Sequence, residues 1–114
     1  MVQPTHPVHR KLTKVAAARQ TITYVAVATL ADLALDNPDD VTILGMILDS
    51  ISEHEVAENR PLLPIVVVDE SGLPWEGVLR YAKRKGLAKA ETDAEFVAAE
   101  LAAVYACWAG DTPC

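Results

Sequence analysis

A run of four branched aliphatic residues, Ile65-Val66-Val67-Val68, most restricts how this 114-residue chain can fold. It follows a connector with two prolines at residues 60–64 and precedes the polar turn 69–72. Branched aliphatic residues favour strands, and a strand that is apolar on both faces is usually covered on both sides. We therefore expect an interior strand, alone or as one arm of a β-hairpin, with the rest of the chain packed around it.

Helical periodicity dominates the rest of the sequence. Apolar residues recur at helical spacing from about 8 to 20, 24 to 36, 40 to 59, 75 to 86 and 92 to 110. The turn 37–40 contains Pro38, Asp40 is the expected N-cap of the third helix, and Asn59 is its expected left-handed end. Gly86 should stop the fourth helix, and Thr92 with Glu95 forms a capping box for the last.

These patterns predict a mainly α (α+β) fold with about five helices and one short buried strand or β-hairpin. They also predict one globular domain over residues 8–110, a flexible lead-in at 1–7 and a tail at 111–114. No apolar run reaches the roughly 18 residues of a membrane-spanning helix, and no secretory signal is visible. Two cysteines, Cys107 and Cys114, fit neither a disulfide framework nor a four-ligand zinc site. We expect a cytoplasmic protein with reduced thiols, with Cys107 as a small core residue.

Charge is segregated along the chain, whose formal net charge is −6. Residues 36–77 carry ten acids and one base, whereas residues 78–90 carry no acid and five bases, namely Arg80, Lys83, Arg84, Lys85 and Lys89. A helix with this basic run can lie against phosphates, with Tyr81 donating a hydrogen bond or stacking. The alternative interpretation is that the bases complement the helix dipole and offset the acidic surface.

Metal and catalytic hypotheses are weaker. His54 and Glu58 share a helix face and suggest a metal site with Glu55 as a base, but a catalytic zinc needs three protein ligands and no third is obvious. His6 and His9 lie in a segment that nothing pre-organises. The sequence has no glycine-rich phosphate loop and no calcium loop. We therefore expect no metal site, no cofactor and no enzymatic activity.

Three segments resemble the DNA-binding domain of alkylguanine-DNA alkyltransferases and their alkyltransferase-like relatives. They are Ile22-Thr23-Tyr24, Leu44-Gly45 and the stretch 64–72, and their order and approximate spacing match over roughly residues 20–80. The resemblance implies a winged helix-turn-helix fold in which Tyr24 contacts the DNA backbone and Leu44 and Gly45 lie on the recognition helix. A closer resemblance, to small uncharacterised bacterial and phage domains with Ile-Thr-Tyr, Leu-Gly and Arg-Pro-Leu-Leu before a valine-rich strand, implies no activity.

Two departures from the alkyltransferase pattern remove the residues that alkyl transfer requires. Ile65 stands where that family has its acceptor cysteine, and Thr42 stands where it has the arginine that displaces the base. Without a thiolate there is no alkyl acceptor, so alkyl transfer is excluded. We expect a non-enzymatic DNA-associated or regulatory module whose third helix approaches a groove while phosphates are held by Tyr24, Arg80, Lys83, Arg84, Lys85 and Lys89.

A second hypothesis, from a different class, is an acidic protein-interaction module such as a phage-type accessory or inhibitor protein. The acidic stretch 36–60, with Glu53, Glu55 and Glu58, would attract a basic partner protein through its field. An exposed Trp75 would anchor that partner. Neither hypothesis involves a membrane.

Overall fold

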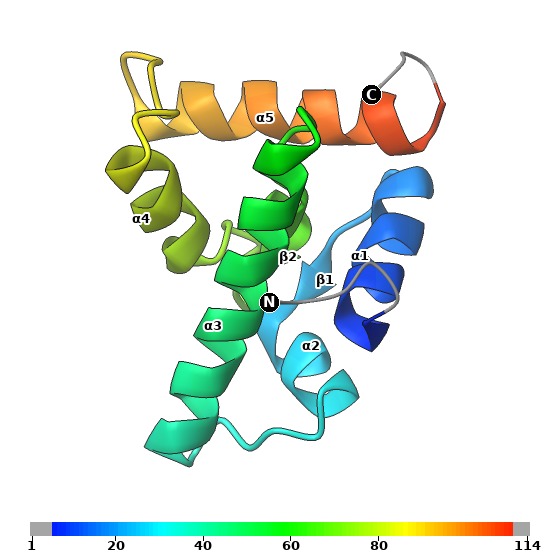
Figure 1. Cartoon of the computed structure of the whole chain (residues 1–114), viewed down its shortest axis with the longest axis vertical. Coiled ribbons are helices and arrows are strands. Elements are labelled where there is room, and N and C mark those ends of the chain that lie inside the picture. The colour runs from blue at the N-terminus through cyan, green and yellow to red at the C-terminus, as the bar shows by residue number, and fades with distance from the viewer. Residues whose placement is uncertain (1–5, 111–114) are drawn as a thin grey trace.

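The computed structural model describes residues 6–110, which form five α-helices, one 3-10 helix and two short strands (Figure 1). In chain order the elements are α1 (Pro7–Ala17), β1 (Ile22–Thr23), α2 (Tyr24–Leu30), α3 (Pro38–Ala57), η1 (Leu63–Val66), β2 (Val67–Val68), α4 (Glu76–Arg84) and α5 (Asp93–Trp108). In Figure 1, α5 lies across one end of the molecule, α3 runs through the middle, and α4 and α1 lie on opposite sides of α3. The predicted mainly helical class is confirmed.

Both expected terminal segments fall largely outside this description. The tail 111–114 and residues 1–5 of the lead-in lie outside the described residues. Of the other two residues of the lead-in, Pro7 opens α1 and His6 is its N-cap, whose Nδ1 accepts a hydrogen bond from the Val8 N–H at 3.1 Å. A proline is well suited to this first position, because its missing N–H would have no helical partner there.

The aliphatic run is interior, as expected, but only half of it is a strand. Ile65 and Val66 belong to η1, and β2 contains only Val67 and Val68. The reason is Pro64, whose ring fixes a φ compatible with a tight helical turn, so the Ile65 N–H donates to the Leu62 carbonyl at 3.0 Å. All four aliphatic side chains are at most 6% exposed, and η1 packs against α1, α3 and α5. The prediction of a four-residue strand is wrong, whereas the prediction of its burial is confirmed.

The sheet is a parallel pair. β1 lies beside β2, with Ile22 opposite Val67 and Thr23 opposite Val68. After β2 the chain reverses over residues 69–73, where the Asp69 N–H donates to the Leu73 carbonyl at 2.8 Å, and one antiparallel bridge joins Val68 to Pro74. The expected lone strand or hairpin is therefore replaced by two distant segments pairing in parallel, and the reversal delivers the chain to α4.

Helix ends follow the local signals in some places and depart from them in others. Thr92 caps α5 as expected, accepting from the Glu95 N–H at 3.1 Å, and both Asn59 (φ 57°) and Gly86 (φ 72°) end their helices in the left-handed region. By contrast, α2 ends at Leu30 and does not continue to residue 36, because Asp32 adopts φ 59° and closes the helix.

The start of α3 also differs from expectation. Its N-cap is Asn37, whose side-chain oxygen accepts from the Asp39 N–H at 2.9 Å, and Pro38 is the first helical residue. The predicted turn at 37–40 is thus the first turn of α3, and Asp40 lies inside the helix. A capping asparagine followed by proline starts the helix three residues earlier than an Asp40 cap would.

The core-facing side of α3 is a row of apolar side chains that ends with a buried carboxylate. Leu44, Leu48 and Ile51 are fully buried, and at the same helical spacing the next residue of the stripe is Glu55, which is also fully buried. A carboxylate at such a position is tolerated only when it is paired. The partners of Glu55 come from two other segments, His9 from α1 and Arg60 from the connector after α3, and are described below.

Candidate functional site

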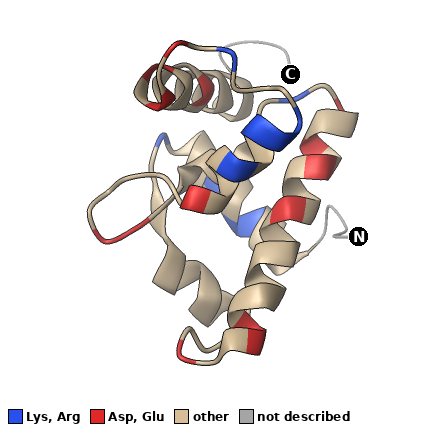
Figure 2. Cartoon of the chain, turned by 90° about the vertical axis from the view of Figure 1, so that its left-hand side faces the viewer, with Lys and Arg blue, Asp and Glu red and all other residues tan. Residues whose placement is uncertain are grey.

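The basic run on α4 is neutralised by nearby acids. Arg80 pairs with Glu76 at 3.4 Å and Lys83 with Asp93 at 3.1 Å. Two further pairs join the end of α4 and its C-cap residue, Lys85, to α3: Arg84–Asp49 at 3.7 Å and Lys85–Glu53 at 3.0 Å. Figure 2 shows the blue bases of α4 beside red acids of α3. The sequence places these four bases on one helix, and the fold gives each of them a carboxylate partner.

Tyr81 lies under these charges and points into the core. Its side chain is 1% exposed, and the Arg84 guanidinium and the Lys85 ammonium lie 5.4 and 5.9 Å from its ring centroid. Burial, followed by the nearby Glu53 carboxylate, raises the pKa of Tyr81 to about 12. The expectation that Tyr81 donates to or stacks on a nucleic acid is wrong, because the ring is covered by the two bases beside it.

Tyr24 and Trp75, which the sequence assigned to different functions, lie together. Their rings stack with centroids 6.0 Å apart and planes 13° apart, and both are half-buried. Burial raises the pKa of Tyr24, an effect that the nearby Arg80 opposes. Trp75 folds back over Gly77, where any Cβ atom would collide with the indole. The pair fixes the entrance to α4 against the start of α2.

The three glutamates at the end of α3 do not share a surface. Glu53 is exposed and paired with Lys85, which lowers the pKa of its carboxyl, and Glu58 is exposed. Glu55 is buried. The expected acidic surface formed by all three is therefore wrong, because helical spacing turns Glu55 onto the core stripe and the other two away from it.

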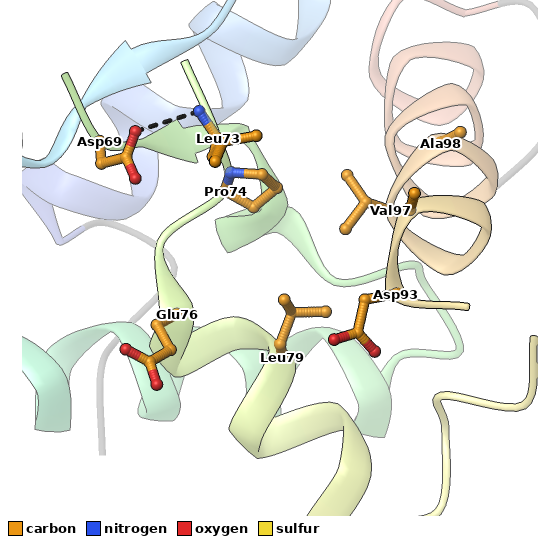
Figure 3. Close-up of a pocket in the computed structure, with 9 residues that line it drawn as sticks. Asp69, Leu73, Pro74, Glu76, Leu79, Asp93, Val97 and Ala98 are labelled. Carbon is orange, nitrogen blue, oxygen red and sulfur yellow. Dashed lines mark hydrogen bonds between the residues drawn. The ribbon is translucent and has the colours of Figure 1, made fainter. Parts of the chain in front are cut away.

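A pocket of about 440 Å³ lies between the turn after β2, the start of α4 and the start of α5 (Figure 3). Its apolar lining consists of Leu73, Pro74, Leu79, Ala94, Val97 and Ala98. Three carboxylates, from Asp69, Glu76 and Asp93, complete the lining, and we call this feature the acid-rimmed pocket. This pocket could not be predicted from the sequence, because its walls come from segments that are contiguous only after folding.

Asp69 and Leu73 shape one wall of the acid-rimmed pocket. The Asp69 Oδ1 accepts hydrogen bonds from the Ser71 N–H at 2.8 Å and from the Leu73 N–H at 3.1 Å, which holds the turn in place. The Leu73 side chain is 63% exposed at this wall. An aliphatic side chain held in solvent beside a preformed apolar cavity gains most when a ligand covers both.

The buried Glu55 is the centre of a second cluster. Its Oε2 lies 2.7 Å from Arg60 Nη2 and 3.5 Å from His9 Nε2, and its Oε1 accepts from Arg60 Nε at 3.3 Å. The hydrogen bond to Glu55 raises the pKa of Arg60. Ligand atoms of His9, His54 and Glu55 all lie within 4.8 Å of one another, so these three side chains form a candidate metal centre.

Two signals in the sequence point to this second cluster. Glu55 continues the apolar stripe Leu44, Leu48, Ile51, and His9 lies within the apolar pattern of the first helix, where it is 5% exposed. Helical spacing alone pairs His54 with Glu58, the exposed C-cap residue of α3, whereas the fold supplies His9 from α1. A ligand donated by a different helix cannot be recognised from spacing alone.

No protein-family model, curated protein or solved structure matches this chain. Within residues 6–110, no helix combines the length and apolar character that crossing a membrane requires.

Cys107 is buried, as expected of a core residue, but it is disulfide-bonded, which corrects the expectation of a reduced thiol at this position.

Proposed function

We propose that this chain is a protein-interaction module that binds a basic, aliphatic segment of a partner protein in the acid-rimmed pocket. The observation that carries the proposal is the combination, in one pocket, of an apolar lining with three carboxylates. The volume of about 440 Å³ lies within the range of sites that take a small ligand or an anchoring side chain. The proposal keeps the predicted class of an acidic interaction module and moves its binding surface away from the glutamates of α3.

Charge complementarity selects the occupant. Two of the rim acids already pair with bases of α4, Glu76 with Arg80 and Asp93 with Lys83, and all four side chains are more than half exposed. Pairs this exposed contribute little stability, so a partner's arginine or lysine can exchange with them at small cost. The net charge of −6 attracts a basic segment over a longer range. An aliphatic side chain between those bases would fill the cavity and cover Leu73.

Duplex DNA remains the competing partner class, together with the winged helix-turn-helix arrangement that the resemblance implies. For DNA to bind through α4, phosphates would have to displace Asp49 and Glu53 from Arg84 and Lys85. The first turn of α3, the expected recognition helix, carries Asp39 and Asp40. These acids repel phosphate, so the charges of α3 and α4 favour a basic protein over DNA.

The test uses a defined probe, a fluorescein-labelled peptide in which leucine alternates with arginine. Two matched peptides replace either every leucine with serine or every arginine with glutamate. We expect fluorescence anisotropy to show micromolar binding of the leucine–arginine peptide only, weakening as salt screens the rim charges. Both features of the pocket are needed for affinity, so neither matched peptide should bind comparably.

A pocket-filling variant locates the binding site. Ala98 lines the pocket on α5, whereas Ala102 is exposed one turn further along the same helix and does not line it. Ala98→Phe should weaken peptide binding by about tenfold, or about 1.4 kcal/mol, while Ala102→Phe should leave it unchanged. Equal affinities in the two variants would contradict the pocket assignment. Binding of short duplex DNA at low salt, without binding of the peptide, would favour the winged-helix proposal instead.

A further inference from the structure

The cluster around Glu55 brings together ligand types that transition metals prefer. His9 projects from α1, and His54 and Glu55 lie in the last turn of α3. The rings of His9 and His54 meet edge to face with centroids 5.6 Å apart. Two imidazoles and one carboxylate are a recurrent three-ligand set for Zn²⁺, with a fourth position left open.

The spacing of the donors fits a single ion. Ligand atoms bound at about 2.0–2.2 Å in a tetrahedron lie roughly 3.3–3.6 Å apart. The His9 Nε2 and Glu55 Oε2 are 3.5 Å apart, and all three donors fall within 4.8 Å of one another. Small side-chain rotations are therefore enough to place the third donor, His54, at the same ion.

A second observation is that His9 is buried without a hydrogen bond to its Nε2. Its side chain is 7% exposed, and among the residues that the structure describes its Nε2 has no hydrogen-bond partner. A buried ring nitrogen without a partner costs free energy, and a metal ion at this point would satisfy it. The same nitrogen lies 3.5 Å from the Oε2 of Glu55, the one fully buried carboxylate among the described residues, so the ring nitrogen without a hydrogen bond and the buried charge lie at the same place.

Arg60 affects both the orientation of Glu55 and the affinity of this cluster for a cation. Its guanidinium contacts both oxygens of Glu55, yet each carboxylate oxygen has a second lone pair that can bind an ion. Arg60 is itself held over the Trp108 ring, 5.3 Å from its centroid. This arrangement orients Glu55 as an outer-shell partner does in metal sites, while its positive charge reduces the affinity for a dication.

We propose that His9, His54 and Glu55 bind a divalent transition-metal ion of the Zn²⁺ class. The ion would join the first helix to the end of the third, beneath Trp108. His54 is only half-buried, so the open coordination position would lie on its side, accessible to water or to a residue of a partner. The site is at the far end of α5 from the acid-rimmed pocket, and the two proposals are independent.

The test is titration of untagged protein with Zn²⁺ by calorimetry and with Co²⁺ by visible absorption. We expect one ion per chain and the intense visible bands of tetrahedral Co²⁺. His9→Gln and His54→Gln should each weaken binding by at least about tenfold, the effect that even outer-shell substitutions have. The third histidine supplies the matched control: His6→Asn keeps an N-cap acceptor for α1 and should leave the affinity unchanged.

A spectroscopic readout places the ion in the structure. The Trp108 ring lies 6.3 Å from that of His9, so bound Co²⁺ should quench its fluorescence in Trp75→Phe, where Trp108 is the only tryptophan. The proposal would be overturned if Zn²⁺ did not bind at micromolar concentrations or if binding survived both histidine variants. Loss of binding in His6→Asn, or Trp108 fluorescence that Co²⁺ does not quench, would also overturn it.

Discussion

Removing Arg60 tests how strongly this fold depends on compensating its buried carboxylate. In Arg60→Met, Glu55 remains fully buried but loses the guanidinium 2.7 Å from its Oε2. Breaking a buried ion pair from one side costs about 3–5 kcal/mol, because the remaining charge stays out of water without a partner. The Arg60 side chain is 21% exposed and His9 Nε2 is 3.5 Å from the same oxygen, so we expect about 3 kcal/mol, the lower end of that range.

The matched control is an arginine whose pair lies in water. Arg84 and Asp49 are 3.7 Å apart, with side chains 57% and 41% exposed. Exposed pairs contribute about 0–1 kcal/mol, so Arg84→Met should be nearly neutral. Replacing both members of the buried pair, in Arg60→Met with Glu55→Met, removes the uncompensated charge and should recover most of the lost stability.

Urea unfolding followed by tryptophan fluorescence measures all three variants, because Trp108 lies against Arg60. A loss of about 3 kcal/mol is a large part of the 5–15 kcal/mol typical of a domain, so the midpoint shift should be clear. The reasoning is refuted if Arg60→Met destabilises the chain no more than Arg84→Met does, or if the double variant recovers nothing.

Two further predictions concern packing and pH. Gly77→Ala places a methyl group against the Trp75 indole and should lower the free energy of unfolding by about 1–3 kcal/mol. Gly45→Ala, in α3, adds a methyl group with no neighbour within 4 Å and should raise the free energy of unfolding by about 0.5–1 kcal/mol. Urea midpoints that did not differ in this order would contradict the packing described. The pKa of Tyr81, about 12 against the ordinary 10.0, means that its neutral form stabilises the fold fully below pH 10 and that this contribution is lost as pH rises through about 12. The alkaline loss should be smaller in Tyr81→Phe, and equal losses in the two proteins would show that Tyr81 is not its source.

Features governed by neighbouring residues were predictable from sequence. Thr92 with Glu95, Asn59 and Gly86 end or begin helices where expected, because capping depends on side chains and φ angles within one turn. The aliphatic run at 65–68 was correctly predicted to be buried. Its conformation was not, because Pro64 bends the first half into η1 and only the second half reaches β1.

The candidate sites were less predictable, for a physical reason. The basic run on α4 is visible in sequence, but its neutralisation depends on Asp49 and Glu53 facing it from α3. Glu55 belonged by spacing to the core stripe of its helix, yet its role depends on His9 and Arg60, which other segments supply. Pairing between helices is a property of tertiary packing, and periodicity within one helix carries no information about it.

The parallel pairing of β1 with β2 has a consequence for how the chain acquires its structure during synthesis. Residues 22–23 find their partners at 67–68, and α1 packs against η1 and α5. The first helix contacts α2 early in the chain, but most of its cover comes from η1 and α5, and contacts between such distant residues form slowly because closing the loop costs entropy. On the ribosome, the native packing of α1 would therefore be completed only after α5 has been released.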